Sequence, residues 1–380
     1  MDQDLRELRR VEFPWAETTV YLNHASTGPL PERTRVVLEG WNRRRTMPFS
    51  LPDPELFAVF TAARALAARL INAHPDEIAL ATNTTWGLAL AAAALPLRPG
   101  DVVVVSDKEF PANVYPWMLL KERGVMLDLV PTTAAGWPDE AAMLERLERP
   151  EVKAVALSLV QFSNGHRADL AAFSAATRRL GKFLVVDGIQ GVGQVPVDLA
   201  ATPVDVLSCG GQKWLLSGWG SGFTYVRREL IGQLRPAMTG WMAFEGTDDF
   251  SRLTAYDPTL RADARRFEMI TLPFHDLAGF NSSVEMLLAV GIDRIAAHLS
   301  ALQAPVIAAA ERAGARITSP RGARGSGILC VAPRDLAGTF ARLKAAGVYA
   351  SLREGAIRLS PHFYTTPEEM ERVGEILEGK

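Results

Sequence analysis

Seven short apolar runs that alternate with stretches of helical periodicity constrain the fold of this chain more than any other feature. The runs read EIALAT, DVVVVS, VMLDLV, VKAVALSLV, FLVVD, DVLSC and GFTYVR. Uninterrupted runs of Val, Leu and Ile, rather than a strict alternation of apolar and polar residues, predict strands that are buried on both faces. Because the runs alternate with helices, we expect an α/β fold with a mostly parallel, seven-stranded sheet covered on both sides.

The order of predicted helices and strands changes after about residue 280. A long helical stretch over 281–313 precedes the strand-like runs SGILCVAP, VYASL and AIRLS and a final helix from Pro367. This order of elements predicts a smaller α+β domain, and a length of 380 residues fits one large and one smaller domain. We expect a segment over 1–20 that packs on the small domain, a large domain over 21–280 and a small domain over 281–380.

Charge and hydropathy exclude several classes of protein. The net charge is −2 and no basic stripe or polybasic segment is present, which argues against nucleic acid and anionic membranes as partners. The longest apolar stretch, Leu88 to Leu97, is too short to span a bilayer, and the N-terminus MDQDLRELRR lacks the apolar core of a signal peptide. The only cysteines, Cys209 and Cys330, lie in apolar runs, so we expect a cytoplasmic protein without a disulfide framework and without a metal site.

The chemistry that the sequence predicts centres on Asp187 and Lys213. Asp187 closes the run FLVVD, and Lys213 follows the run DVLSC in the segment GGQKW. In parallel sheets, ligands gather at the carboxyl ends of the strands. A carboxylate and a lysine at neighbouring strand ends can hold a pyridoxal phosphate ring, because the lysine forms a Schiff base and the carboxylate keeps the pyridine nitrogen protonated. In isolation, the pair is also compatible with an ordinary strand-end aspartate and a surface lysine.

Two further segments follow strands of the predicted sheet. Thr84 and Thr85, in TNTTWG, open a helix, where free N–H groups and hydroxyls can bind a phosphate or where a threonine simply caps the helix. Phe110, in EFPANVYPW, either stacks on a heteroaromatic ring or fills the core. If it stacks, Asn113 can donate a hydrogen bond to a ring substituent.

Gln190 and Arg358 complete the set of candidates. Gln190 lies in the segment DGIQ, where its amide can reach the phenolic oxygen of a pyridoxal ring. Arg358, in EGAIRLSPHF, can bind a substrate carboxylate with two parallel hydrogen bonds, or it is an exposed strand arginine. The glycines near these residues match neither G-x-G-x-x-G nor the P-loop pattern, so a dinucleotide site and a P-loop are not expected.

With these residues in order, the chain resembles the class V aminotransferase family. This fold type I, pyridoxal-phosphate-dependent group includes cysteine desulfurases, kynureninases and isopenicillin-N-epimerase-like proteins. The resemblance runs from YLNHASTGPLP at 21–31 to RLSPHFYTTPEE at 358–369. It implies a fold type I large domain, pyridoxal 5'-phosphate as cofactor and an amino acid as substrate.

The resemblance also implies the role of each residue. Lys213 would carry the cofactor, Asp187 would pair with its ring nitrogen and Arg358 would bind the α-carboxylate of the substrate. The other implied cofactor contacts are Thr84, Thr85, Phe110, Asn113, Gln190, Ser208 and Gln212. Thr271 resembles a threonine that reaches the phosphate of the neighbouring subunit, which implies a homodimer with shared sites. Asn23 and His24 lie in a segment that lines the substrate pocket in relatives, and His24 is equally compatible with a structural role.

One departure from the family bears on the reaction. Cysteine desulfurases carry a nucleophilic cysteine on a loop before the arginine strand, whereas this chain reads AAGVYASLREGAIRLS there. Persulfide chemistry of that type is therefore disfavoured, and β-elimination by a lyase is the preferred expectation. An aminotransferase and an amino-acid epimerase remain open as alternatives, and so does a binding protein that kept the fold without catalysis.

Overall fold

The computed structural model describes residues 1, 3–269 and 271–379, and its larger sheet has the seven predicted strands. The strand order is β2-β8-β7-β6-β5-β3-β4. β8 runs antiparallel to its neighbours β7 and β2, and the remaining pairs are parallel. The bounds are β2 Ile78–Leu80, β3 Val102–Ser106, β4 Met126–Val130, β5 Val152–Ser158, β6 Phe183–Asp187, β7 Val206–Gly210 and β8 Gly222–Val226. The predicted α/β fold is confirmed.

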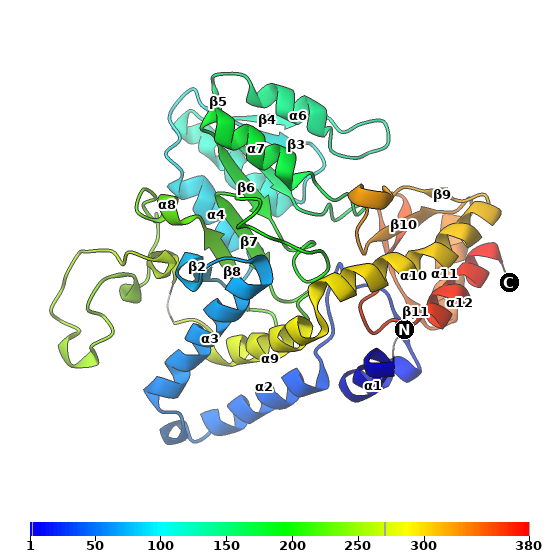
Figure 1. Cartoon of the computed structure of the whole chain (residues 1–380), viewed down its shortest axis with the longest axis horizontal. Helices are drawn as coiled ribbons and strands as arrows, with labels where there is room; N and C mark the ends of the chain where they lie inside the picture. The colour runs from blue at the N-terminus through cyan, green and yellow to red at the C-terminus, as the bar shows by residue number, and fades with distance from the viewer. Residues whose placement is uncertain (2, 270, 380) are drawn as a thin grey trace.

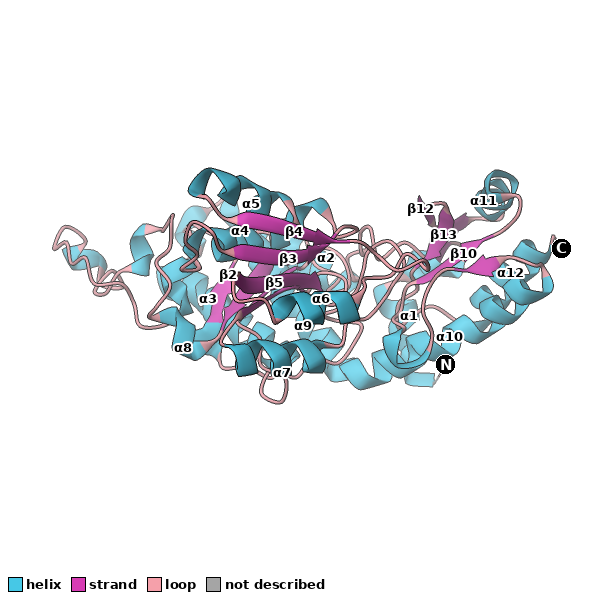
Figure 2. Cartoon of the chain, turned by 90° about the horizontal axis from the view of Figure 1, so that it is seen from above, coloured by secondary structure: helices cyan, strands magenta, loops and turns pink. Residues whose placement is uncertain are grey.

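Helices cover both faces of this sheet. The burial of β3 explains why this strand is an unbroken run of apolar residues. Val102 and Val104 belong to one buried hydrophobic cluster, while Val103 and Val105 belong to another. Successive side chains of a strand point to opposite faces, so a strand with a core on each side needs apolar residues throughout. Figure 2 shows α4 and α5 on one side of the sheet and α6 and α7 on the other. The bounds are α4 Thr84–Ala94, α5 Tyr115–Met118, α6 Glu140–Leu147 and α7 Leu170–Leu180.

Of the other helices of the large domain, α3 packs against β2 and α9, and α2 packs against α9 on the side away from the sheet (Figure 1). The bounds are α2 Glu32–Arg45, α3 Asp53–Ile71, α8 Arg228–Ile231 and α9 Phe274–Val290. The long helical stretch expected over 281–313 consists of the second half of α9 and of α10 (Ile292–Arg312), because the chain turns at Gly291 with a φ of 91°. The expected domain boundary at residue 280 therefore falls inside α9.

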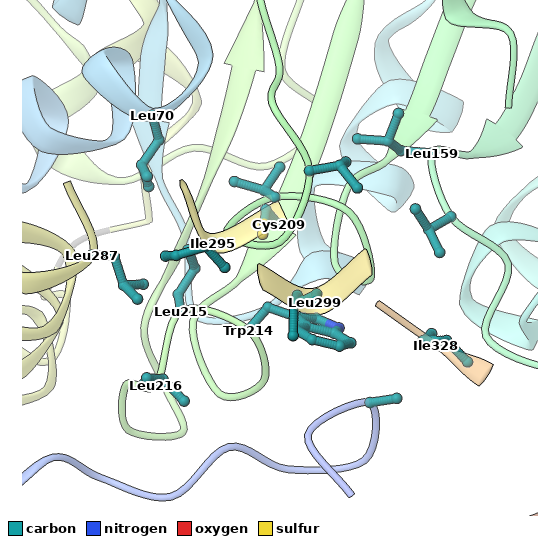
Figure 3. Packing of buried hydrophobic residues seen from close by; sticks show 14 of the residues in the cluster. Leu70, Leu159, Cys209, Trp214, Leu215, Leu216, Leu287, Ile295, Leu299 and Ile328 are labelled. Atoms are coloured by element: carbon teal, nitrogen blue, oxygen red, sulfur yellow. The ribbon is translucent and has the colours of Figure 1, made fainter. Parts of the chain in front are cut away.

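The smaller sheet is antiparallel and has the order β12-β13-β10-β9. Its strands are β9 Arg316–Ile317, β10 Leu329–Ala332, β12 Ser351–Arg353 and β13 Ala356–Leu359, and it lies with α10, α11 (Leu336–Ala345) and α12 (Pro367–Glu378). The two domains share one core: Trp214 of the large domain, Leu299 of α10 and Ile328 lie together in a single buried cluster (Figure 3). The Lys213 segment is therefore packed against the small domain.

The N-terminal segment joins the small domain. Strand β1 (Val20–Tyr21) pairs in parallel with β11 (Val348–Tyr349), and the guanidinium of Arg9 in α1 (Gln3–Glu12) lies 2.9 Å from the carboxylate of Glu369 in α12. Among the described residues, no helix is long and apolar enough to cross a membrane.

Candidate functional site

The ends of β6 and β7 bring the two central residues together. Asp187 is the last residue of β6 and pairs in register with Ser208 of β7, after which the chain turns through two glycines to Lys213. Asp187 is 2% exposed, and its Oδ1 accepts a hydrogen bond from the backbone N–H of Ile189 at 3.0 Å. The parallel strands therefore place a buried carboxylate beside the lysine segment.

Burial shifts the pKa values of both groups toward neutrality. Loss of water raises the pKa of Asp187 to about 7, although the Ile189 N–H and the charge of Lys213 oppose this shift. Loss of water also lowers the pKa of Lys213 to about 8, against the attraction of Asp187. An amine with such a pKa is partly neutral near physiological pH, as a nucleophile and base must be.

Phe110 lies directly over this lysine. The Nζ of Lys213 is 5.6 Å from the centroid of the Phe110 ring, which also makes an edge contact with Phe162 at 5.2 Å between centroids. Phe110 is 42% exposed, so it is not core filler. Of the two possibilities open from the sequence, this exposure favours a ring whose face is free to stack on a ligand.

The start of α4 meets the end of β7 near Lys213. Asn83, not a threonine, caps the helix, since its Oδ1 accepts from the N–H of Trp86 at 3.0 Å. The hydroxyl of Thr84 accepts from the N–H of Gly210 at 2.9 Å, and its carbonyl accepts from the hydroxyl of Ser208 at 2.9 Å. Thr84 and Ser208 thus tie the helix to the sheet, and the cofactor contact implied for Ser208 stays a prediction. Thr85 is exposed in the first turn, where a phosphate can be bound.

Arg358 lies on β13, in the domain interface. Its side chain donates to the carbonyl of Phe162 at 2.7 Å, to the hydroxyl of Ser26 at 2.7 Å and to the hydroxyl of Ser351 at 3.2 Å. It is 1% exposed, and burial lowers its pKa to about 10. No carboxylate of the described residues forms an ion pair with Arg358, so it is a buried cation that lacks a counter-ion. A buried guanidinium of this kind is suited to bind an anion.

Two of the predicted contacts are engaged in internal hydrogen bonds. Gln190 is buried; its Nε2 donates to the carbonyl of Ala25 at 2.8 Å and its Oε1 accepts from the indole of Trp214 at 2.8 Å. His24 is fully buried, with its ring nitrogens 2.8 Å from the carbonyl of Ser360 and 2.8 Å from the hydroxyl of Tyr364. Gln190 therefore links the Lys213 segment to the N-terminal segment, and His24 links the N-terminal segment to the small domain. For His24, this placement corrects the implied substrate contact in favour of the structural role.

Glu109 is a member of the site that the sequence analysis missed. Its carboxylate accepts from the N–H of Ser158 at 2.8 Å, from the Ser158 hydroxyl, from Gln161 Nε2 and from Asn113 Nδ2 at 3.2 Å. Burial raises its pKa, and its charge contributes to the raised pKa of Asp187. One N–H of Asn113 is thus used by Glu109, its Oδ1 has no hydrogen-bond partner among the described residues, and the contact with a ring substituent stays a prediction. The signal in the sequence was an acid next to an aromatic residue just after a strand, which is common at surfaces too.

The remaining predicted contacts lie at the edges of the site. The backbone carbonyl of Gln212 accepts from the N–H of Gly28 at 2.8 Å, which joins the lysine segment to the segment containing Asn23. Asn23 is half-buried, and its Oδ1 has no hydrogen-bond partner among the described residues. Thr271 is exposed and lines a surface cavity of about 390 Å³ with Trp41 and Pro48. The implied contact of Thr271 with the phosphate of a partner subunit stays a prediction.

We call the group formed by Phe110, Asp187, Lys213 and Arg358 the Lys213 site, and its chemistry fits pyridoxal 5'-phosphate. A partly neutral lysine, a buried carboxylate, an open aromatic face and a helix start with an exposed threonine match the aldehyde, ring nitrogen, ring face and phosphate of that group. The buried, uncompensated Arg358 then remains for a carboxylate.

Comparisons with known proteins agree with this fit. The family model for aminotransferase class-V matches residues 21–338. The protein named uncharacterized aminotransferase YcbU of Bacillus subtilis (strain 168) is 30% identical over 311 residues, which are 81% of this chain and 80% of that protein.

Solved structures share the fold at lower sequence identity. The apo structure of a cysteine desulfurase from Thermococcus onnurineus NA1 has a TM-score of 0.86 at 20% identity, covering 98% of this chain and 97% of that one. The cystine C–S lyase C-DES, in complex with its product cysteine persulfide, has a TM-score of 0.87 at 21% identity, covering 97% and 99%. The chain therefore belongs to the aminotransferase class-V family, and it is a pyridoxal 5'-phosphate-dependent enzyme.

Proposed function

We propose that this enzyme is a lyase that removes the Cα proton of an amino acid and eliminates the substituent on Cβ, with an S-substituted cysteine as the expected type of substrate. One observation carries the proposal. Arg358 is a buried cation without a carboxylate partner among the described residues, and Phe162 and Phe110 connect it to Lys213 through successive contacts. An amino acid whose α-carboxylate binds Arg358 would therefore lie close to Lys213.

The proton transfer is assigned to Lys213. When bound, the cofactor acts as an electron sink for the pair of electrons left on Cα. Burial lowers the pKa of Lys213 to about 8, so its amine can accept the Cα proton at Nζ near neutral pH. The carboxylate of Asp187 would hold the ring nitrogen, and the guanidinium of Arg358 would bind the α-carboxylate and so orient the substrate.

The elimination balances without an added oxidant or reductant. The Cα–H and Cβ–S bonds break, the sulfur leaves with the electron pair of its bond and takes up a proton, and hydrolysis of the remaining fragment consumes one water. The expected products are a thiol, pyruvate and ammonia. No catalytic residue other than a base and its charged neighbours is required.

A nucleophilic cysteine is not part of this proposal. The segment between β12 and β13 consists of Glu354 and Gly355 and is too short for a cysteine-bearing loop. Cys209 and Cys330 are fully buried, and burial raises both thiol pKa values, that of Cys330 to about 11. A buried thiol that stays protonated does not attack sulfur. This favours release of an intact leaving group over the reaction of cysteine desulfurases.

Transamination and epimerisation remain the alternatives, because both begin with the same loss of the Cα proton. The 30% identity to a protein named an aminotransferase supports the first of them. The test is to incubate the loaded enzyme with a panel of amino acids and S-substituted cysteines and to measure pyruvate, ammonia, thiol, keto acids and the configuration of the remaining substrate. Keto acid without ammonia would support an aminotransferase, and loss of configuration alone would support an epimerase.

Substitutions at Lys213 and Arg358 test whether product formation and amino-acid binding depend on the Lys213 site. Lys213→Ala is expected to abolish product formation, whereas Lys153→Ala, which changes an exposed lysine on β5, leaves it unchanged. Arg358→Ala is expected to weaken amino-acid binding by about 2 kcal/mol or more, the scale of losing a buried charged partner, whereas Arg316→Ala on the same sheet has no effect. A protein that binds the cofactor and gives no product with any of these amino acids would instead support the non-catalytic binding protein.

A further inference from the structure

A second arginine lies beside Arg358 on the same face of the small sheet. Strands β12 and β13 pair so that Ser351 is opposite Arg358 and Arg353 is opposite Ala356. Residues opposite each other in an antiparallel pair share a face, as do residues two apart in one strand. Arg353 and Arg358 are therefore diagonal neighbours, with Cα atoms about 7–8 Å apart.

The shared face is the one that looks toward the large domain. Arg358 reaches the carbonyl of Phe162 and the hydroxyl of Ser26 from this face, and both acceptors belong to the large domain. The positive charge of Arg353 also affects Arg358 and Lys213. After burial, which is the main cause, Arg353 contributes to the lowered pKa values of Arg358 and Lys213. Arg353 is thus within electrostatic reach of the lysine and of the carboxylate-binding arginine.

Arg353 has no anion of its own among the residues that the structure describes. Its Nη1 donates to the neighbouring carbonyl of Leu352 at 2.7 Å, and no ion pair with a carboxylate is present. The side chain is exposed at the open end of the hairpin, whereas Arg358 is 1% exposed at the interior end. The two guanidinium groups therefore form a deep and an outer cation on one face.

The backbone fixes this outer cation in position. Glu354 and Gly355 connect the strands directly, with φ values of 43° and 76°. Positive φ at both residues of a two-residue connection is the pattern of a type I′ turn, which matches the twist of the flanking strands and makes a rigid hairpin. Arg353 is the last residue before this turn, so its backbone cannot move away from Arg358 without breaking the pairing.

We propose that the preferred substrate carries a second acidic group, on its side chain or leaving group, which Arg353 binds while Arg358 binds the α-carboxylate. This inference rests on the proposed function, because it takes an amino acid to be bound at Arg358. It narrows the substrate class to amino acids with two anionic ends, such as a dicarboxylic amino acid or a cysteine whose sulfur substituent ends in a carboxylate.

The experiment uses pairs of ligands that differ only in this charge. The pyridoxal 5'-phosphate-loaded enzyme is titrated with S-carboxymethylcysteine and S-carbamoylmethylcysteine, with aspartate and asparagine, and with glutamate and glutamine, and the change in cofactor absorbance gives each dissociation constant. We expect at least one acid to bind about tenfold more tightly than its amide, the size of one hydrogen bond to a charged group. Alanine, with no side-chain acid, is the reference for binding at Arg358.

Variants assign the preference to Arg353. Arg353→Gln is expected to bring the acid and its amide to equal affinity and to change alanine binding much less than binding of the acid, while Arg353→Lys retains part of the preference and Arg316→Gln, on the edge strand, retains all of it. Equal affinities in the unmodified enzyme, or an acid preference that survives in Arg353→Gln, would overturn the assignment to Arg353 and leave the proposed lyase intact. The absence of any absorbance change with every amino acid would overturn both.

Discussion

At the scale of single residues, Asp187 and Lys213 illustrate how burial prepares a site for chemistry. The fold keeps a carboxylate and an amine from water at adjoining strand ends, so the pKa of Asp187 rises to about 7 and that of Lys213 falls to about 8. The protein without its cofactor therefore bears an electrostatic cost at these residues. Binding of a protonated ring nitrogen next to Asp187 relieves part of this cost.

The first prediction concerns the stability of the cofactor-free protein. Because the folded pKa of Asp187 is raised from 3.8 to about 7, the folded state holds a proton that the unfolded chain releases between these values. The free energy of unfolding should therefore fall as pH rises from about 4 to about 7. Asp187→Asn removes the titration and should be more stable than the unmodified protein above pH 7 by roughly 2–4 kcal/mol. Urea unfolding from pH 4 to pH 8 measures the difference, and equal pH dependence of both proteins would contradict it.

The second prediction concerns Glu109, whose negative charge contributes to the raised pKa of Asp187. In Glu109→Gln that charge is lost, so Asp187 should release its proton at lower pH. We expect the midpoint of the pH-dependent change in stability to move down by up to about one unit. Glu122→Gln, at an exposed position, serves as the control. A general loss of stability with an unmoved midpoint would mean that Glu109 acts only through its hydrogen bonds.

At the scale of elements, the approach of α4 to β7 and β8 positions the predicted phosphate turn. This approach depends on Gly87, because a Cβ at that position would lie 2.1 Å from the hydroxyl oxygen of Thr224 and 2.4 Å from that of Ser208. The helix therefore sits directly on the sheet, and its first turn is held by the hydrogen bonds between Thr84 and the end of β7. The absence of a side chain at Gly87 therefore allows α4 to pack directly on the sheet.

The third prediction follows from this contact. Gly87→Ala should push α4 away from β7, destabilise the fold by about 1–3 kcal/mol and weaken binding of pyridoxal 5'-phosphate. Gly40→Ala is a matched control in helix α2, where no atom lies within 4 Å of the added methyl group. There we expect a gain of up to about 1 kcal/mol from helix propensity. Urea unfolding and cofactor titration of both variants measure these changes, and equal effects of the two substitutions would contradict the role of Gly87.

At the scale of the whole molecule, two highly exposed aromatic side chains of the large domain bear on the question of whether the chain forms a dimer. Figure 1 shows the segment between α8 and α9 projecting away from both sheets. Tyr256 in this segment is 88% exposed, and Phe49 near the end of α2 is 87% exposed. Contiguous exposed apolar patches can mark contact surfaces, whereas single exposed apolar side chains are common on monomers. The homodimer that the resemblance implied therefore stays a prediction.

The fourth prediction is that the protein sediments as a dimer and that Thr271 acts across its interface. Thr271→Asp places a negative charge near the expected phosphate, so it should weaken cofactor binding and reduce product formation. If Thr271 acts in the partner subunit, mixed dimers of Thr271→Asp and Lys213→Ala contain one site with both native residues. Each mixed dimer should therefore have up to half of the native activity, so a mixture of the two variants should be more active than either variant alone. A monomer with full cofactor affinity, or mixtures without restored activity, would contradict the shared site.

Local sequence determined much of this protein. Each apolar run became a strand, because a strand covered on both faces needs apolar residues throughout, and the polar residues that end β6 and follow β7 came together because parallel strands share their carboxyl edge. The family, the fold and the cofactor were therefore predictable and are confirmed. The helical stretch expected over 281–313 is helical apart from a break at Gly291, where a positive φ separates α9 from α10.

Only the tertiary structure decided how each side chain is used. His24 is engaged by Ser360 and Tyr364, Gln190 by Ala25 and Trp214, and Arg358 lies against Phe162 without a counter-ion, all through contacts between residues far apart in the chain. The same holds for Arg353, which reads as a surface arginine until the hairpin register places it beside Arg358. The burial of a side chain and its hydrogen-bond partners are decided when segments distant in the sequence come together. The sequence therefore determines which residue types are present, whereas the fold determines which donors and acceptors stay unpaired and which groups are charged.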